Sequence, residues 1–127
     1  MASILIVDNE EIIRKMLIRM LQADGHEVEQ AEGASQARAI LERKPIDLIL
    51  MDIYMPEMNG LALMKSINDT YPGIQTILIS GRHSMDAEKT ARQFGAYTFL
   101  KKPFTRRELL KIVKNALDNK KKSPDDE

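Results

Sequence analysis

The polar side chains best suited to chemistry each follow an apolar run of strand-like length. The run 48–51, for example, ends at Asp52 and passes into a loop marked by Pro56 and Gly60. Short apolar runs bounded by such breakers are typical of strands buried on both faces. The polar residues that follow the apolar runs are Asp8, Asn9, Asp52, Ser80 and Lys102.

Together these residue types suit phosphoryl transfer assisted by a metal ion. Two carboxylates and an amide are hard oxygen ligands of the kind that Mg²⁺ prefers. A lysine ammonium and a serine hydroxyl can hold phosphate oxygens, and a carboxylate can accept a phosphoryl group as an aspartyl-phosphate. We therefore interpret Asp52 as a nucleophile for a phosphoryl group, with Asp8 and Asn9 as candidate Mg²⁺ ligands.

The elements that must position these residues alternate regularly along the chain. The predicted strands cover residues 3–7, 26–31, 46–51, 74–79 and 96–100. The predicted helices between and after them end at Gly25, Pro45, Tyr71, Gly95 and Asp118. This alternation indicates an α/β fold, a parallel sheet covered on both faces with right-handed crossovers. All strands of such a sheet end at one edge, so the polar residues above are expected to meet there.

Apolar spacing also predicts which helix residues face the core. For the first helix the expected core face is Ile12, Ile13, Met16, Leu17, Met20 and Leu21. The predicted helix 84–94 carries few large apolar residues, which indicates low local stability. His26 and His83 have no spacing typical of a metal site, and both are expected at the surface.

Composition limits the class of protein. The 127 residues fit one domain, and we expect residues 1–118 to form it, with 119–127 as a charged tail or linker. Lys+Arg and Asp+Glu are equal at 19 each, which gives no support for nucleic acid or a membrane as an electrostatic partner. The absence of Cys excludes disulfides and thiolate metal sites. The apolar run at the N-terminus is too short for a signal peptide, so a soluble cytoplasmic domain is expected.

Five segments in order carry a resemblance to a known family. They are Ile4-Leu5-Ile6-Val7-Asp8-Asn9-Glu10, the run from Leu48 through Asp52 to Met55-Pro56-Glu57-Met58-Asn59-Gly60, Ile77-Leu78-Ile79-Ser80-Gly81, Gly95-Ala96, and Phe99-Leu100-Lys101-Lys102-Pro103-Phe104. The sequence resembles the receiver domain of two-component response regulators over roughly residues 3–117. The resemblance implies a flavodoxin-like, doubly wound sheet of five parallel strands in the order 2-1-3-4-5, with five helices.

The resemblance also implies a role for each site residue. Asp52 would be the phosphoacceptor, and a sensor histidine kinase or phosphotransfer protein the donor. Mg²⁺ would be held by Asp8, Asn9, Asp52 and the backbone carbonyl of Tyr54. Ser80 and Lys102 would bind the phosphoryl group, and Ser80 with Phe99 would form the switch. Tyr54 and Arg82 would tune dephosphorylation, which we expect to be slow. The Lys102–Pro103 peptide is commonly cis in the family.

By the same resemblance, the helix 84–94, the fifth strand and the last helix would form the output face. That face is a possible homodimer interface. The domain would catalyse only its own phosphorylation and dephosphorylation, and would not act on a metabolite.

The sequence departs from the family pattern at Asn9, where a second acid is usual. We expect weaker Mg²⁺ binding as a result, and Asn9 could instead cap the first helix. Phe99 is as compatible with plain core as with a switch. Two other functions stay open: an enzyme with an Asp nucleophile acting on small phosphate esters, and a phosphorylation-independent interaction module. The enzyme is disfavoured because Tyr54 stands where a second acid would be needed.

Overall fold

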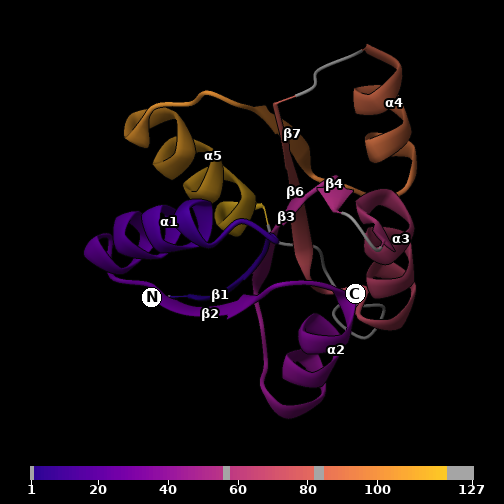
Figure 1. Cartoon of the computed structure of the whole chain (residues 1–127), viewed down its shortest axis with the longest axis horizontal. Coiled ribbons are helices and arrows are strands. Elements are labelled where there is room, and N and C mark those ends of the chain that lie inside the picture. The colour runs from indigo at the N-terminus through magenta and orange to yellow at the C-terminus, as the bar shows by residue number, and fades with distance from the viewer. Residues whose placement is uncertain (1, 56–57, 82–84, 120–127) are drawn as a thin grey trace.

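The computed structural model describes residues 2–55, 58–81 and 85–119 (Figure 1). Its centre is a five-stranded sheet in the order β2-β1-β3-β6-β7, in which all neighbouring strands are parallel. The strands are β1 (Ser3–Val7), β2 (Glu27–Ala31), β3 (Leu48–Asp52), β6 (Gln75–Ser80) and β7 (Thr98–Lys101). Numbered along the chain without the short pair β4 and β5, this is the order 2-1-3-4-5, and the fold prediction is confirmed.

Helices cover both faces of the sheet, as Figure 1 shows. Among the described residues they are α1 (Glu11–Ala23), α2 (Ala34–Arg43), α3 (Gly60–Thr70), α4 (Met85–Gln93) and α5 (Arg106–Asp118). Leu17 of α1 and Leu109 of α5 belong to one core, while Ala37 of α2, Leu63 of α3 and Ala91 of α4 belong to the other. Helices α1 and α5 therefore pack on one face, and α2, α3 and α4 on the opposite face.

The central strands are largely apolar because both of their faces are buried. In β1, Leu5 and Val7 enter one core while Ile4 and Ile6 enter the other, and none of the four is exposed to solvent. Side chains of a strand alternate between the two faces of a sheet, so a strand covered on both sides needs a continuous apolar run.

A short antiparallel pair of strands, β4 (Tyr54–Met55) and β5 (Met58–Asn59), follows β3 where a loop was predicted. In this hairpin the chain reverses direction after Asp52, and α3 begins directly after β5. Asn59 caps α3, because its side-chain oxygen accepts a hydrogen bond from the backbone N–H of Leu61 at 2.9 Å.

The predicted core face of α1 is partly wrong. Ile12 is 81% exposed and Met16 is 36% exposed, whereas the buried residues of α1 are Arg14, Leu17 and Leu21. Successive helix residues are turned by about 100°, so Ile12 lies about 200° around the axis from Arg14. The apolar stripe of α1 is wider than the surface that packs on the sheet, so Ile12 and Met16 at one edge of the stripe remain exposed to water.

His26 is less exposed than a surface position suggests. Its side chain is only 12% exposed, and its Nε2 lies 3.4 Å from Oδ2 of Asp24. His26 Nδ1 accepts a hydrogen bond from the backbone N–H of Ala2 at 3.3 Å. The imidazole therefore connects the start of the chain to the turn before β2. His83, the other histidine expected at the surface, lies outside the described residues.

No helix in the described ranges has both the length and the apolar character needed to cross a membrane.

Candidate functional site

The predicted site residues follow strands that end at one edge of the sheet. The register pairs Val7 with Met51, Asp52 with Ile79 and Ser80 with Lys101. Asp8 follows β1 directly, Asp52 and Ser80 are the last residues of β3 and β6, and Lys102 follows β7. The shared edge is where open α/β sheets bind their ligands.

Lys102 bridges two buried carboxylates at this edge. Its Nζ lies 3.4 Å from Oδ2 of Asp52 and 3.6 Å from Oδ2 of Asp8. The lysine side chain is 19% exposed, and those of the two aspartates are 7% and 3% exposed. One positive charge is therefore shared between two acids that are nearly removed from water.

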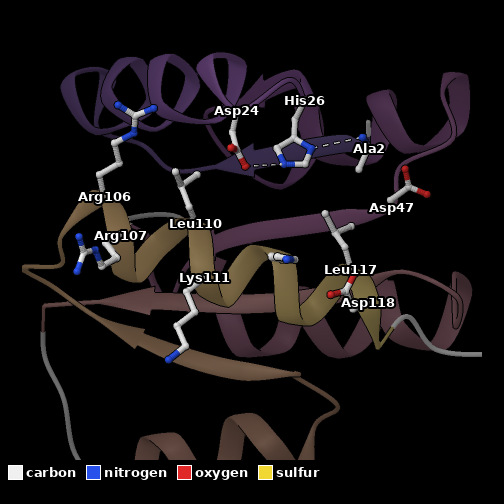
Figure 2. Close-up of a pocket in the computed structure, with 11 residues that line it drawn as sticks. Ala2, Asp24, His26, Asp47, Arg106, Arg107, Leu110, Lys111, Leu117 and Asp118 are labelled. Carbon is white, nitrogen blue, oxygen red and sulfur yellow. Dashed lines mark hydrogen bonds and ion pairs between the residues drawn. The ribbon is translucent and has the colours of Figure 1, made fainter.

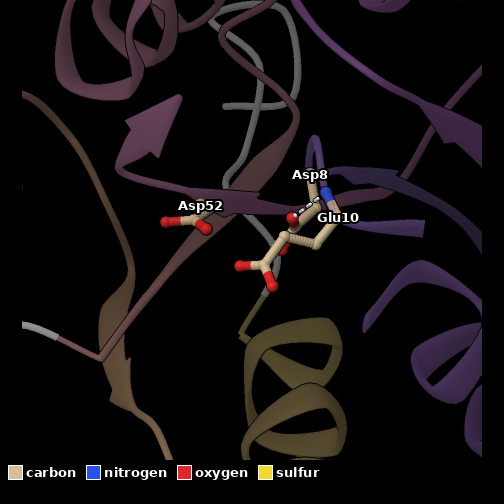
Figure 3. Close-up of side chains that lie close together, drawn as sticks. All are labelled: Asp8, Glu10 and Asp52. Atoms are coloured by element: carbon tan, nitrogen blue, oxygen red, sulfur yellow. Dashed lines mark hydrogen bonds between the residues drawn. The ribbon is translucent and has the colours of Figure 1, made fainter. Parts of the chain in front are cut away.

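A third carboxylate, that of Glu10, joins this pair. One ligand atom each of Asp8, Glu10 and Asp52 lies within 4.8 Å of the others (Figure 3). The backbone N–H of Glu10 donates to Oδ1 of Asp8 at 2.8 Å, which curls the turn around the Asp8 carboxylate. Sequence reasoning missed Glu10, although its position two residues after Asp8 allows such a turn.

The carboxylates at this edge outnumber the ammonium group among them. Burial raises the pKa of Asp8 above its usual 3.8, against the lowering effects of the Glu10 N–H bond and of Lys102. The neighbouring charges of Asp52 and Glu10 raise the Asp8 pKa further. Because burial makes the ionised form of the Asp8 carboxylate unfavourable, a cation bound beside it would relieve that cost.

The donor set fits Mg²⁺. Carboxylate oxygens are its usual protein ligands, and it binds through few of them because it keeps several waters. Asp8 and Asp52 are buried, while Glu10 is exposed and closes the cluster from the solvent side. Asn9, a predicted ligand, is exposed and lies between Asp8 and Glu10.

Asn9 is not the cap of α1. The N-cap residue is Glu10, and no side-chain bond caps this helix. The alternative that Asn9 serves as a helix cap is therefore wrong.

The other predicted site residues lie at different depths. Ser80 is fully buried, and its backbone carbonyl accepts a hydrogen bond from the N–H of Lys102 at 2.8 Å. Phe99 is half-buried and packs against the core shared by α2, α3 and α4. Tyr54 begins β4, one residue beyond Ile53, but its side chain lies outside the described part, as does all of Arg82. The Lys102–Pro103 peptide is cis, as the resemblance implied.

Gly60 allows the chain to pass closely behind Asp52. A Cβ at Gly60 would lie 2.5 Å from the backbone oxygen of Asp52 and 2.8 Å from Cα of Ile53. The N–H of Gly60 donates to the carbonyl of Ile53 at 2.9 Å. Only glycine fits this contact, and the contact holds the loop after Asp52 against the start of α3.

A wide groove of about 1070 Å³ lies along α5, away from these acids (Figure 2). Leu110 and Leu117 form its apolar part, and His26 and Asp24 lie on the opposite side. None of the clustered acids lines this groove. The candidate chemistry therefore belongs to the sheet edge and not to this wider hollow.

Known proteins share this fold. The model of the response regulator receiver domain matches residues 4–114. An NtrX-like response regulator of Rickettsia bellii is 34% identical over 117 residues, which is 91% of this chain and 24% of that protein. This chain thus spans about a quarter of the length of the curated relatives it matches.

Solved structures agree with the sequence match. A CheY-like receiver domain protein from Methanospirillum hungatei superposes with a TM-score of 0.89 at 32% identity, covering 94% of this chain and 95% of that one. The beryllofluoride-activated NtrC4 receiver domain dimer also gives a TM-score of 0.89, at 30% identity, covering 94% of this chain and 98% of that one. Because the family model covers most of the chain and the fold agrees, this chain belongs to the response regulator receiver domain family.

Proposed function

We propose that this domain is a phosphorylation switch whose acceptor is Asp52. The observation that carries the proposal is the buried Asp52 carboxylate, with the Lys102 ammonium 3.4 Å away and Asp8 and Glu10 beside it. A buried acid with an adjacent ammonium and a cluster of cation ligands suits the gain of a dianionic group. Ser80, at the end of the next strand, would donate a hydrogen bond to that group.

The reaction exchanges one bond to phosphorus for another. An oxygen of Asp52 bonds to phosphorus as the P–N bond to the donor's phosphohistidine breaks, and the histidine leaves with the bonding electron pair. Lys102 pairs with a phosphoryl oxygen and offsets its charge. Bound Mg²⁺, held by Asp8, Glu10 and Asp52, with Asn9 and the Tyr54 carbonyl as further candidate ligands, would supply the remaining positive charge.

The proposed donor is a sensor histidine kinase or a phosphotransfer protein in the cytoplasm. An apolar patch on α1 supports a protein donor: Ile12 and Met16 are exposed and line a hollow of about 330 Å³ with Met20. Lys15 and Arg19 border the same hollow. The helix that carries the patch begins one residue after Glu10, so a partner bound there would reach the acids.

The proposed output face consists of α4, β7 and α5. Arg92 ties α4 to β7, since its guanidinium lies 3.4 Å from the carbonyl of Tyr97 and 3.3 Å from Oγ1 of Thr98. The phosphoryl group would act on this face through Ser80 and Phe99, and the face would then bind a partner or a second copy. The NtrC4 receiver domain, solved as an activated dimer, supports the second possibility.

Phosphorylation with a small donor tests the acceptor directly. The purified domain is incubated with acetyl phosphate and Mg²⁺, and its mass is measured. We expect one phosphoryl group on the wild type and on Asp69→Asn, which changes an exposed acid of α3, and none on Asp52→Asn. The hydrolysis rate of the product measures the proposed slow dephosphorylation.

Two results would overturn the proposal. One is an unmodified wild type at millimolar Mg²⁺, which would favour an interaction module that works without phosphorylation. The other is phosphorylation of Asp52→Asn to the wild-type level. Multiple turnover of a generic phosphomonoester would instead favour the small-molecule enzyme.

A further inference from the structure

Arg14 is a buried cation close to the acidic turn. It lies on the inner face of α1 and is 6% exposed. Its three side-chain nitrogens contact three different residues. Nε donates to Oε1 of Gln30 at 2.9 Å, Nη1 donates to the backbone carbonyl of Asp8 at 2.7 Å, and Nη2 lies 3.5 Å from Oε1 of Glu32.

These contacts connect the end of β1 to the end of β2. The bond to Asp8 is buried, whereas Glu32 is 66% exposed, so the ion pair adds little by itself. A guanidinium is rigid and planar, with donors in fixed directions. Arg14 can therefore hold the Asp8 carbonyl in one orientation relative to β2.

The carbonyl that Arg14 binds belongs to the peptide between Asp8 and Asn9. The other groups of Asp8 are also engaged: its N–H donates to the carbonyl of Ala31 at 3.1 Å, and its Oδ1 accepts from Glu10 N–H at 2.8 Å. Fixing the plane of that peptide sets the direction in which the chain leaves Asp8. It thereby sets where Asn9 and Glu10 point.

We propose that Arg14 is a positioning residue for the metal-binding turn, and that it orients residues 8–10 toward Asp52 through the Asp8 carbonyl. This rests on the proposed function only in that the turn binds Mg²⁺. Arg14 acts through the backbone and not as a ligand. Groups that orient metal ligands in this way typically change metal affinity by about 10–100-fold when removed.

Whether replacing Arg14 raises or lowers the Mg²⁺ affinity distinguishes a positioning role from a purely electrostatic one. A buried positive charge near a cation site opposes cation binding, so removing the charge alone should strengthen Mg²⁺ binding. Loss of positioning should weaken it. Arg14→Met removes both the charge and the donors, and weaker binding then shows that positioning dominates.

Two further variants sharpen the comparison. Arg14→Lys keeps the charge but has one ammonium in place of the guanidinium, which cannot reproduce the three contacts. Arg43→Met removes an exposed arginine from the end of α2 and changes the net charge equally. We expect Mg²⁺ affinity to fall about tenfold or more in Arg14→Met and by less in Arg14→Lys, and to stay unchanged in Arg43→Met.

Mg²⁺ is titrated without any phosphoryl donor, and the backbone amide NMR signals of residues 8–10 are followed. The metal-free spectra give a second readout, because a turn released from Arg14 should show shifted amide signals for Asn9 and Glu10. Circular dichroism establishes that each variant is folded at the working temperature. If Arg14→Met is not folded, the test uses Arg14→Lys and Gln30→Ala instead. We expect both variants to bind Mg²⁺ more weakly than the wild type.

The outcomes separate this inference from the phosphorylation proposal. Mg²⁺ affinity that is equal or higher in folded Arg14→Met, with unshifted amide signals, overturns the positioning role and leaves the acceptor role of Asp52 intact. If Arg14→Met is unfolded, unchanged affinity in Arg14→Lys and Gln30→Ala overturns it too. A wild type that does not respond to Mg²⁺ overturns both the positioning role and the metal requirement.

Discussion

At the scale of single residues, burial raises the pKa of the Asp8 carboxyl group at the sheet edge. Asp8 and Asp52 are buried, and Lys102 lies between them at 3.4–3.6 Å. One ammonium cannot balance two carboxylates and the nearby Glu10. The metal-free domain therefore holds unfavourable charge that its ligands would relieve, which is the usual cost of a preformed site.

Asp8→Asn should stabilise the metal-free domain near neutral pH. Burial raises the pKa of Asp8 in the folded state above 3.8. The contribution of Asp8 to stability is thus present below its unfolded pKa and is lost as pH rises through the folded pKa. The midpoint of thermal unfolding of Asp8→Asn should exceed that of the wild type by a margin that grows as the pH rises from about 4 through the folded pKa of Asp8, with about 1 kcal/mol giving about 4 °C.

The measurement uses circular dichroism in the presence of a chelator. Asp69→Asn, which alters an exposed acid paired with Lys65, is the control and should follow the wild type at each pH. A difference between Asp8→Asn and wild type that does not change with pH would contradict the expectation.

Gly60→Ala should damage the acceptor loop. The added Cβ would meet backbone atoms of Asp52 and Ile53 that cannot rotate away. We expect a loss of about 1–3 kcal/mol in the free energy of unfolding, measured in urea, and slower phosphorylation of the folded fraction. Gly73→Ala is the control, because a Cβ there would meet nothing within 4 Å. Equal stability of the two variants would show that the close contact at Gly60 relaxes freely.

The residues at the strand ends could be predicted because parallel strands end together. Asp8 and Asp52 needed only that rule, whereas the choice of Lys102 over the adjacent Lys101 came from the family resemblance. The structure brings all three together. Glu10 and Arg14 could not be placed in this way, because their positions depend on the conformation of one turn. The spacing of Arg14 with Leu17 and Leu21 did carry a signal, a charge on the buried side of a helix.

At the scale of elements, the start of α5 is fixed a few residues after Lys102. Helix α5 begins three residues after the cis Lys102–Pro103 peptide, and Thr105 closes a capping box with Glu108. Thr105 Oγ1 accepts from the N–H of Glu108 at 3.0 Å, and Oε1 of Glu108 accepts from the N–H of Thr105 at 2.9 Å. This cap fixes the start of the helix that follows Lys102.

Thr105→Ala should lower the free energy of unfolding by about 1 kcal/mol, because it leaves an N-terminal N–H of α5 without its acceptor. Urea unfolding measures the change. Thr70→Ala provides the control: the Thr70 hydroxyl donates to the carbonyl of Ser66 near the end of α3 and caps no helix start. An equal loss of unfolding free energy in Thr70→Ala would show that the helix cap at Thr105 stabilises the protein no more than an ordinary threonine hydrogen bond.

The extent of each element was easier to predict than the faces of α1. Strand β1 was predicted at 3–7 and found at Ser3–Val7, since a polar residue ends its apolar run. In α1 the apolar residues cover more than half of the helix surface, so spacing alone could not show that Ile12 and Met16 face solvent. Only packing against β2 and α5 decides that.

At the scale of the whole molecule, one sheet separates two cores, and the site lies at its edge. Strands β6 and β7 lie between the site and the proposed output face, because Ser80 ends β6 and Phe99 of β7 pairs with Leu78 of β6. Among the α4 side chains described, Ala91 is the buried one, whereas α2 buries Ala37, Ile40 and Leu41. The α4 sequence has Met85 as its one large apolar residue, which indicates low local stability, as elements that switch tend to have.

Beryllofluoride mimics the phosphoryl group proposed for Asp52. When it is added together with Mg²⁺, the rates of backbone amide hydrogen exchange should change in some elements and not in others. Before addition, amides of α4 should exchange faster than those of α2, because fewer apolar contacts hold α4. After addition we expect slower exchange in α4 and β7, since the ligand favours one of two arrangements, and little change in α2. Asp52→Asn should show no response. Equal slowing in α2 and α4 would instead indicate a uniform gain in stability, with no route through β6 and β7 to the output face.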